Sequence, residues 1–373
     1  MQNPFTFGDI VSGEHFVDRQ REISELTQAL LSRTNVIIAS PRRYGKTSLA
    51  LEVFRRINKQ GVLTIYVDLF PATSRIRFIE IYAEAISRAS RDKLEEAVAF
   101  LKEILPTPKI VIKAQGIPGI EVELERTRKD DETLLASILD APEKLAEKKK
   151  KCVAVAFDEF QEIDNLNGEQ MQREIRSKIQ HHSKVAYVFL GSRRHLLDKL
   201  FSDKMKPLYR MGKPFNLGPI PNHDFKNFIR REFESTKIHI SDNIVDEILS
   251  FTECHPYYTQ QLCHETWNLT SSESRVEKSH VTKAIQNVLT SQSYAFVTIW
   301  ESLPPSQRAL LRGVAINGGT RIFSKEFVRS HSLGTSSNVQ KAAQYLVDRG
   351  FLERIDGSYV VTDVFHREWL RRI

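Results

Sequence analysis

Residues 35–49 read NVIIASPRRYGKTSL, a short apolar run followed by a polar loop that ends in glycine, lysine and threonine. The apolar run predicts a buried strand, and a helix is expected to open near Thr47. A loop in this position presents backbone N–H groups and the positive end of the helix dipole, which together bind phosphate. We expect Lys46 to reach the β- and γ-phosphates of a nucleoside triphosphate and the Thr47 hydroxyl to ligate Mg²⁺. The predicted phosphate-binding residues are Ser40, Pro41, Arg42, Arg43, Tyr44, Gly45, Lys46, Thr47 and Ser48.

A second apolar run, residues 153–157, comes later in the chain and ends in Asp158 and Glu159. We expect Asp158 to reach the outer ligand shell of Mg²⁺ and Glu159 to orient or deprotonate a water molecule. The two runs follow one another in the order that a P-loop nucleotide site requires. Together they predict a site for a nucleoside triphosphate and Mg²⁺.

The loop departs from the P-loop pattern at its first position, where Ser40 replaces glycine. Gly45 is therefore the only one of the two motif glycines that is present. Serine fits the turn if its φ is negative, but it is strained at positive φ, where glycine is not. The alternative is a chance Gly-Lys-Thr triplet after a buried strand. The strand–loop–helix context and the later acidic pair favour the nucleotide site.

The bulk composition limits the kind of protein. The chain has 373 residues, enough for two or three domains. Its net charge of +7 permits a nucleic-acid partner but does not argue for one. No apolar run approaches the ~20 residues of a membrane helix, no secretory signal is visible, and three cysteines form no disulfide framework. We therefore expect a cytoplasmic protein without a membrane partner.

The periodicity of apolar residues divides the chain into three parts. Residues 1–220 alternate strand and helix signals and predict a parallel α/β sheet, with a β-hairpin inserted at about 107–127. Residues 221–292 carry only helical spacing and predict a helical domain. Residues 293–373 follow the order helix, helix, helix, hairpin, which is typical of a winged helix, with a short strand at 321–323 after the first helix.

The strand at residues 185–190 ends in a polar segment that could sense the γ-phosphate. Arg193 or Arg194 would stabilise the charge that develops there, with Arg193 as the first choice. The alternative is an exposed arginine pair at the start of a helix. Ser192 would either bond the γ-phosphate or the attacking water, or cap the following helix.

These motifs resemble those of the archaeal-type STAND ATPases, nucleotide switches related to AAA+ proteins. The loop at residues 41–47, the acidic strand end at 157–161, and Gly191 with Ser192 are similar to the family's P-loop, acidic strand and sensor strand. The resemblance implies ATP or ADP as the ligand. Residues 16–22 are similar to the motif that lies near the adenine, although Asp18 replaces a glycine and Gln20 intervenes. The residues that this motif would place at the base are Phe16, Val17 and Arg19.

The resemblance extends to the helical part, which corresponds to the family's lid. Residues 254–257 are similar to its Gly-x-Pro motif, with Cys254 in place of glycine, and this implies that Pro256 closes over the base. Proline at the first turn of a helix needs no function, so both interpretations stay open. Archaeal replication initiators, which are AAA+ ATPases that also end in a winged helix, carry an arginine early in a lid helix. Residues 254–261 contain none, which favours the STAND class.

The winged-helix part leaves its partner open. Residues 301–373 carry eleven Lys or Arg against seven Asp or Glu, a net charge of +4 that is low for a DNA reader. Winged helices also bind proteins, so double-stranded DNA, a protein partner and docking on the ATPase core of the same chain are all candidates. For DNA, the expected base-reading side chains are Ser337, Asn338, Lys341 and Gln344, and the expected phosphate contacts are Lys325, Arg349 and Arg354.

Taken together, the sequence predicts a P-loop α/β ATPase core, a helical lid and a winged helix. The favoured function is a slow ATP-hydrolysing switch of the STAND type. One alternative is a DNA-binding, initiator-like AAA+ regulator licensed by ATP. Another is a scaffold that binds nucleotide without hydrolysis, against which the intact Lys46, Thr47, Asp158 and Glu159 argue.

Overall fold

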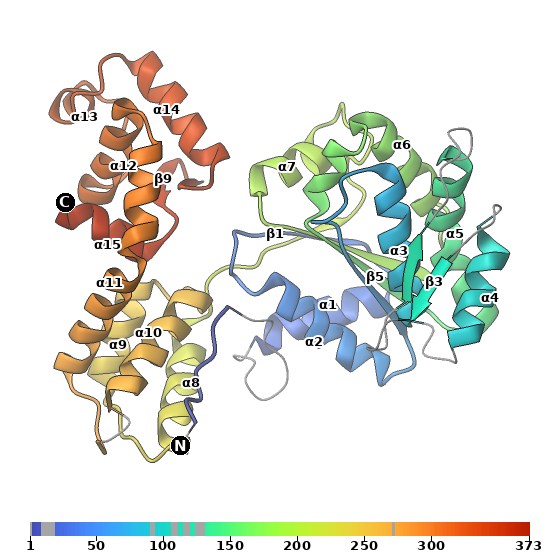
Figure 1. Ribbon diagram of the computed structural model, residues 1–373, viewed down its shortest axis with the longest axis horizontal. Coiled ribbons are helices and arrows are strands. Elements are labelled where there is room, and N and C mark those ends of the chain that lie inside the picture. The colour runs from blue at the N-terminus through green and yellow to red at the C-terminus, as the bar shows by residue number, and fades with distance from the viewer. Residues whose placement is uncertain are drawn as a thin grey trace. The chain divides into compact units, whose positions relative to one another are not determined.

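A computed structural model of the protein describes seven stretches of the chain, which are residues 2–8, 19–89, 94–105, 111–114, 120–123, 131–270 and 273–373. These residues divide into two compact units (Figure 1). The sheet unit is Ile10–Gly218, and the helical unit is Pro219–Ile373 together with Met1–Asp9. Within the described residues no helix is long and apolar enough to cross a membrane.

The sheet unit is built on the strands β1 (Val36–Ala39), β2 (Leu63–Asp68), β5 (Val153–Asp158), β6 (Val185–Gly191) and β7 (Lys213–Phe215). Their order in the sheet is β2-β5-β6-β1-β7, and every neighbouring pair is parallel. β5 and β6 are buried along their whole length, which is why their sequences are continuous apolar runs rather than alternating ones. The predicted parallel α/β fold is therefore confirmed.

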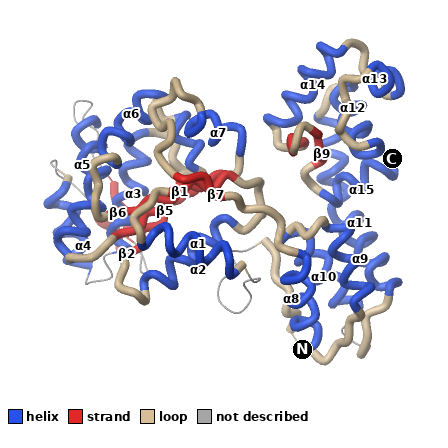
Figure 2. Tube along the Cα trace, turned by 180° about the vertical axis from the view of Figure 1, so that it is seen from behind, coloured by secondary structure: helices blue, strands red, loops and turns tan. Residues whose placement is uncertain are grey.

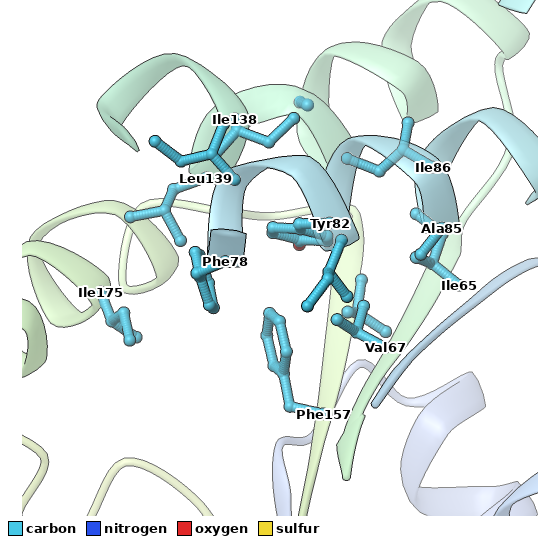
Figure 3. Close-up of a cluster of buried hydrophobic side chains, with 14 of the residues drawn as sticks. Ile65, Val67, Phe78, Tyr82, Ala85, Ile86, Ile138, Leu139, Phe157 and Ile175 are labelled. Atoms are coloured by element: carbon cyan, nitrogen blue, oxygen red, sulfur yellow. The ribbon is translucent and has the colours of Figure 1, made fainter. Parts of the chain in front are cut away.

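Helices cover both faces of this sheet (Figure 2). Because side chains alternate along a strand, β5 sends Ala154 and Ala156 to one face and Val155 and Phe157 to the other. The alanine face packs against α1 (Gln20–Leu31) and α2 (Lys46–Asn58). On the opposite face, Phe157 lies under Phe78 and Tyr82 of α3 (Arg75–Ala89) (Figure 3). The other elements around this face are α4 (Leu94–Ile104), α5 (Asp131–Lys149), η2 (Phe160–Asn165), α6 (Gly168–Ile179) and α7 (Arg194–Ser202).

A separate antiparallel pair lies between α4 and α5, within the segment for which the hairpin was predicted. It consists of β3 (Val111–Ala114) and β4 (Ile120–Glu123). Val122 of β4 is buried in the same core as α3 and α5. The pair is therefore anchored on the helices of the sheet unit rather than added to the central sheet.

The first part of the helical unit is formed by α8 (Asn222–Ser235), α9 (Asp242–Thr252), α10 (Pro256–Thr270) and α11 (Lys278–Ser302). The amino-terminal segment packs here, since Phe5 is buried against Phe228 and Phe233. The α11 helix continues without a break from Lys278 to Ser302, so the predicted boundary between residues 292 and 293 falls inside it.

The rest of the helical unit is a winged helix, which confirms that part of the predicted fold. Its core is formed by apolar residues of its first and third helices and of the hairpin. The predicted strand at residues 321–323 is wrong, because these residues form a turn and only Gly319 bridges to Tyr359. A side chain at Gly319 would overlap the Tyr359 backbone. The elements are α12 (Pro305–Asn317), α13 (Lys325–Ser330), α14 (Ser336–Asp348), β8 (Leu352–Ile355), β9 (Ser358–Val361) and α15 (Val364–Arg372), the last of which was not predicted.

Candidate nucleotide site

The loop between β1 and α2 has the conformation that its glycine permits. Gly45 lies immediately before α2 with φ +82°, in the left-handed region. No atom would crowd a side chain there, so glycine is needed for its backbone freedom rather than for space. Arg43 also adopts positive φ, at +65°, although it is not glycine. The loop is thus tightly wound just before the helix amino terminus, as a phosphate-binding loop must be.

Ser40 occupies its position without backbone strain. It is fully buried and is not among the residues with positive φ. Its hydroxyl donates a hydrogen bond to the Leu217 carbonyl oxygen at 2.8 Å, and its N–H donates to the Gly191 carbonyl oxygen at 3.3 Å. Serine therefore adds a contact that glycine could not make.

Lys46 is the buried cation of the loop. Its side chain is 5% exposed, and Nζ donates to the carbonyl oxygens of Ser40 at 2.7 Å and Pro41 at 2.6 Å. The ammonium group thus lies over the loop that would hold the phosphates. Phosphate oxygens would offer it stronger, charge-assisted partners than these neutral carbonyls.

The carboxylate of Asp158 is held at both oxygens. Oδ2 accepts hydrogen bonds from the Thr47 hydroxyl at 2.5 Å and from the Tyr66 hydroxyl at 2.8 Å, and Oδ1 accepts from the Glu159 N–H at 2.9 Å. Burial, with the nearby Asp158 charge, raises the pKa of Tyr66, so this phenol remains a neutral donor. Tyr66 lies on β2, beside β5 in the parallel register, and the sequence offered no signal for its role.

Glu159 adopts the left-handed region with φ +50° directly after β5. Its Oε2 accepts a hydrogen bond from the Ser192 hydroxyl at 2.8 Å and a second from the Gln161 side-chain amide. Ser192 follows the last residue of β6, Gly191, so the ends of the two strands meet here. A side chain at Gly191 would overlap the Gln161 amide and Leu197.

The two arginines after Ser192 differ in their surroundings. Arg193 is exposed at the residue before α7. Arg194 is half-buried, and its charge lies near the Asp198 carboxyl one turn along the helix. Burial raises the pKa of Asp198, and the Arg194 charge opposes that rise.

Arg19 is buried against the loop, 3% exposed. Its guanidinium donates to the Tyr44 carbonyl oxygen at 3.3 Å, to the Gly218 carbonyl oxygen at 2.9 Å and to Glu22 at 3.0 Å. Phe16 and Val17, predicted beside it, lie outside the described residues. Of the remaining loop residues, Arg42 and Arg43 are exposed, and Ser48 is half-buried in the first turn of α2.

Pro256 belongs to the helical unit, where it is the first residue of α10. The two residues Glu253 and Cys254 both have positive φ, at +55° and +53°. Cys254 therefore has the backbone conformation that glycine adopts most readily.

The side chains of Lys46, Thr47, Asp158, Glu159 and Ser192 converge at the carboxyl ends of β1, β5 and β6. This is the edge of a parallel sheet where ligands usually bind. In the described part of the chain, no three His, Cys, Asp or Glu side chains come together as a metal cluster. The sequence-predicted residues that the structure brings to this edge are the loop residues with Lys46 and Thr47, together with Asp158, Glu159, Ser192 and Arg193. The neighbours that the sequence did not reveal are Tyr66 and Gln161.

A sequence profile described as an ATPase domain predominantly from Archaea matches residues 16–262, which include both motifs and the strands that carry them. The chain belongs to this family. Membership in this ATPase family implies nucleotide binding. A second profile, for a probable winged helix domain, matches residues 294–372. No curated protein matches the chain.

Two solved structures share the fold of this member of the ATPase family over nearly their whole length. The Walker-type ATPase PABY2304 of Pyrococcus abyssi has a TM-score of 0.70 at 16% identity, with 99% of each chain covered. The ORC2 protein of Aeropyrum pernix, solved in ADPNP–ADP complexes, has a TM-score of 0.59 at 13% identity, with 98% of this chain and 95% of that chain covered. At these identities the likeness establishes a shared P-loop ATPase fold.

Proposed function

We propose that the protein binds ATP with Mg²⁺ at this site and hydrolyses it slowly, as a nucleotide-dependent switch of the STAND type. The observation that carries the proposal is the convergence of Thr47, Asp158, Glu159 and Ser192 at one end of the sheet. A chance Gly-Lys-Thr triplet would not bring a hydroxyl, a carboxylate pair and a sensor-strand serine to the same edge.

The donor set of the site fits Mg²⁺. Mg²⁺ prefers oxygen ligands and is usually held by one or two protein groups together with phosphates and water. The Thr47 hydroxyl and the Asp158 carboxylate are such groups and already lie in contact. Mg²⁺, when bound, would neutralise charge on the β- and γ-phosphates. Lys46 and the loop N–H groups would hold the same phosphates, and Tyr66 would keep Asp158 in place.

Glu159 would be the residue that orients and deprotonates the attacking water. Ser192 would fix the Glu159 carboxylate, and Arg193 would stabilise charge on the γ-phosphate. The exposure of Arg193 and the proximity of Arg194 to Asp198 favour Arg193 for this role.

The nucleotide state would be transmitted to the helical unit through residues 217–218, where the sheet unit ends. The Ser40 hydroxyl bonds the Leu217 carbonyl and Arg19 joins the carbonyls of Tyr44 and Gly218, so the loop is tied to this connection at two points. We propose three functional parts: residues 1–220 as the core, 221–292 as a lid and 293–373 as the winged-helix module. The nucleotide state would change the position of the lid. The residues proposed to contact the adenine base of the nucleotide are Phe16, Val17, Arg19 and Pro256.

The decisive experiment compares Glu159→Gln with Asp158→Asn in the full-length protein. Glu159→Gln keeps shape and hydrogen bonding but removes the base, so ATP binding by calorimetry should be near normal while hydrolysis falls by ~10²-fold or more. Asp158→Asn should instead weaken Mg²⁺-dependent binding. If Glu159→Gln leaves turnover untouched, the base lies elsewhere and the proposed mechanism is wrong.

A second candidate function, DNA binding licensed by ATP, is favoured by one specific observation. On α14 the apolar residues Val339, Ala343 and Leu346 are buried in the winged-helix core. The predicted DNA-contacting residues all remain exposed, namely Lys325, Ser337, Asn338, Lys341, Gln344, Arg349 and Arg354. Such an arrangement leaves α14 able to enter a major groove.

Titration of a fluorescent DNA duplex at several salt concentrations tests this candidate. Affinity should fall linearly with log salt at a slope near −0.9 per phosphate neutralised. Arg354→Ala should flatten that slope by about one unit, whereas Lys341→Ala should change sequence preference. If no salt-dependent binding occurs with or without ATP, the DNA candidate is refuted and a protein partner is favoured.

Substitutions of exposed residues test the role of the winged helix better than deletion of the whole module. Phe365 of α15 contacts Phe251 and Tyr258 of α9 and α10, with ring centroids 5.5 and 6.0 Å apart. Removing the winged-helix module would therefore strip buried contacts from the lid helices. A change in ATP turnover after this deletion could come from loss of winged-helix docking on the ATPase core or from misfolding of the lid helices, and the assay would not distinguish the two.

A further inference from the structure

Gln161 is a buried polar residue next to the candidate base. It lies in η2, two residues after Glu159, and its side chain is 3% exposed. Its amide nitrogen donates to Oε2 of Glu159, the same oxygen that accepts the Ser192 hydroxyl. Two donors from two different elements thus converge on one carboxylate oxygen.

The other oxygen of Glu159 is left for a ligand. Among the described residues, no hydrogen bond reaches Oε1 of this carboxylate. Donors from η2 and from the end of β6 hold Oε2, so rotation of the carboxylate would break both bonds. Oε1 is therefore the oxygen able to accept a proton from water.

The chemistry of the amide sets its orientation. A carboxylate accepts hydrogen bonds only, so the NH₂ group rather than the carbonyl oxygen of Gln161 must face Glu159. The carbonyl oxygen then points away and is buried without a partner in the described part of the chain. It lies where a side chain at Gly191 would be, so the glycine makes room for the amide. A buried carbonyl without a partner is costly, so the contact with Glu159 is made at the expense of this oxygen.

We propose that Gln161 is a positioning residue for Glu159. With Ser192 it fixes Oε2 so that Oε1 faces the attacking water, and it acts on hydrolysis through Glu159 rather than by touching ATP. The inference rests on the proposed function, in which Glu159 is the base.

The test variant is Gln161→Met in the full-length protein. Methionine has a similar length and flexibility but cannot donate to the carboxylate, and it removes the unpaired carbonyl. We expect the rate of ATP hydrolysis at saturating Mg²⁺-ATP to fall by about 10- to 100-fold, since misplacement of a reacting group is that costly. ATP affinity by calorimetry and the thermal midpoint should stay close to those of the unmodified protein.

Gln172→Met is the matched control. Gln172 is fully buried in α6 of the same unit, donates to Asp164 at 2.7 Å, and also has an unpaired carbonyl oxygen. It differs from Gln161 in having no contact with Glu159. Its replacement should leave the hydrolysis rate unchanged. An equal loss in both variants would show that the effect is structural and would overturn the proposal.

A double-mutant cycle separates this inference from the function on which it rests. If Gln161 acts through Glu159, Gln161→Met should cause no further loss in the Glu159→Gln background. Additive losses would overturn the positioning role. If Glu159→Gln does not slow hydrolysis at all, the proposed base is wrong. If Glu159→Gln slows it and Gln161→Met does not, only the role of Gln161 is refuted.

Discussion

His366 should make the helical unit sensitive to acid. The residue lies on α15 with its side chain 3% exposed, and its ring stacks on Phe296 of α11, with centroids 5.0 Å apart and planes at 10°. Its Nε2 is buried and has no hydrogen-bond partner among the described residues. Burial lowers the pKa of His366 to about 4, against the opposing charge of Asp363. Protonation of the folded protein would therefore place an unpaired charge between two helices.

The pH dependence follows from the two pKa values. Above pH 6.5 the ring is neutral in both the folded and the unfolded chain, so it has no effect on stability. Between pH 6.5 and pH 4 the unfolded chain binds a proton that the folded chain does not, so stability falls as the pH falls. For these values the free energy of unfolding drops by about 2 kcal/mol between pH 7 and pH 5.

Urea unfolding followed by tryptophan fluorescence measures this loss in the full-length protein. The three tryptophans of the chain are Trp267, Trp300 and Trp369, and all lie in the helical unit, so the signal reports on that unit. The variant His366→Phe keeps a ring against Phe296. Between pH 7 and pH 5 its free energy of unfolding should fall by about 2 kcal/mol less than that of the unmodified protein. Because each protein is compared with itself, any packing cost of the substitution cancels.

His223→Gln is the control for this experiment. His223 belongs to the same unit, on α8, but its side chain is 85% exposed. Its replacement should leave the dependence of stability on pH unchanged. If the unmodified protein and His366→Phe lose the same free energy between pH 7 and pH 5, burial of His366 does not govern acid stability and the reasoning is refuted.

Three further predictions concern the nucleotide site. Lys46→Ala should weaken ATP binding at least about tenfold in calorimetry, because a charge-assisted bond is lost; undiminished affinity would contradict the P-loop assignment. Ser40→Gly should lower the free energy of unfolding by about 1–2 kcal/mol, through loss of the bond to Leu217 and gain of unfolded-chain entropy, with little change in ATP affinity. A large gain in affinity would show instead that serine weakens the loop. Tyr66→Phe should raise the Mg²⁺ concentration for half-maximal hydrolysis several-fold, since Asp158 loses a donor; identical midpoints would show that Tyr66 does not position the carboxylate.

The nucleotide loop and the sheet could be predicted because their signals are local. The apolar run before Ser40, the glycine that must take positive φ and the helix that follows are all encoded within 15 consecutive residues. The continuous apolar sequence of β5 likewise indicates burial on both faces, and hence a parallel sheet. On α14, the helical spacing of Val339, Ala343 and Leu346 indicates both the helix and its buried side.

The partners of the site residues depended on the tertiary structure. The Ser40 hydroxyl bonds Leu217, 177 residues away along the chain, and the Tyr66 hydroxyl bonds Asp158 across 92 residues. Neither contact can be predicted from the periodicity of the sequence, because the two partners meet only when the parallel strands lie side by side. The same holds where Ser192 meets Glu159 at the adjoining ends of β5 and β6. Local patterns thus determine which residues form the loop and the strands, whereas the order of strands in the sheet determines which side chains meet at its edge.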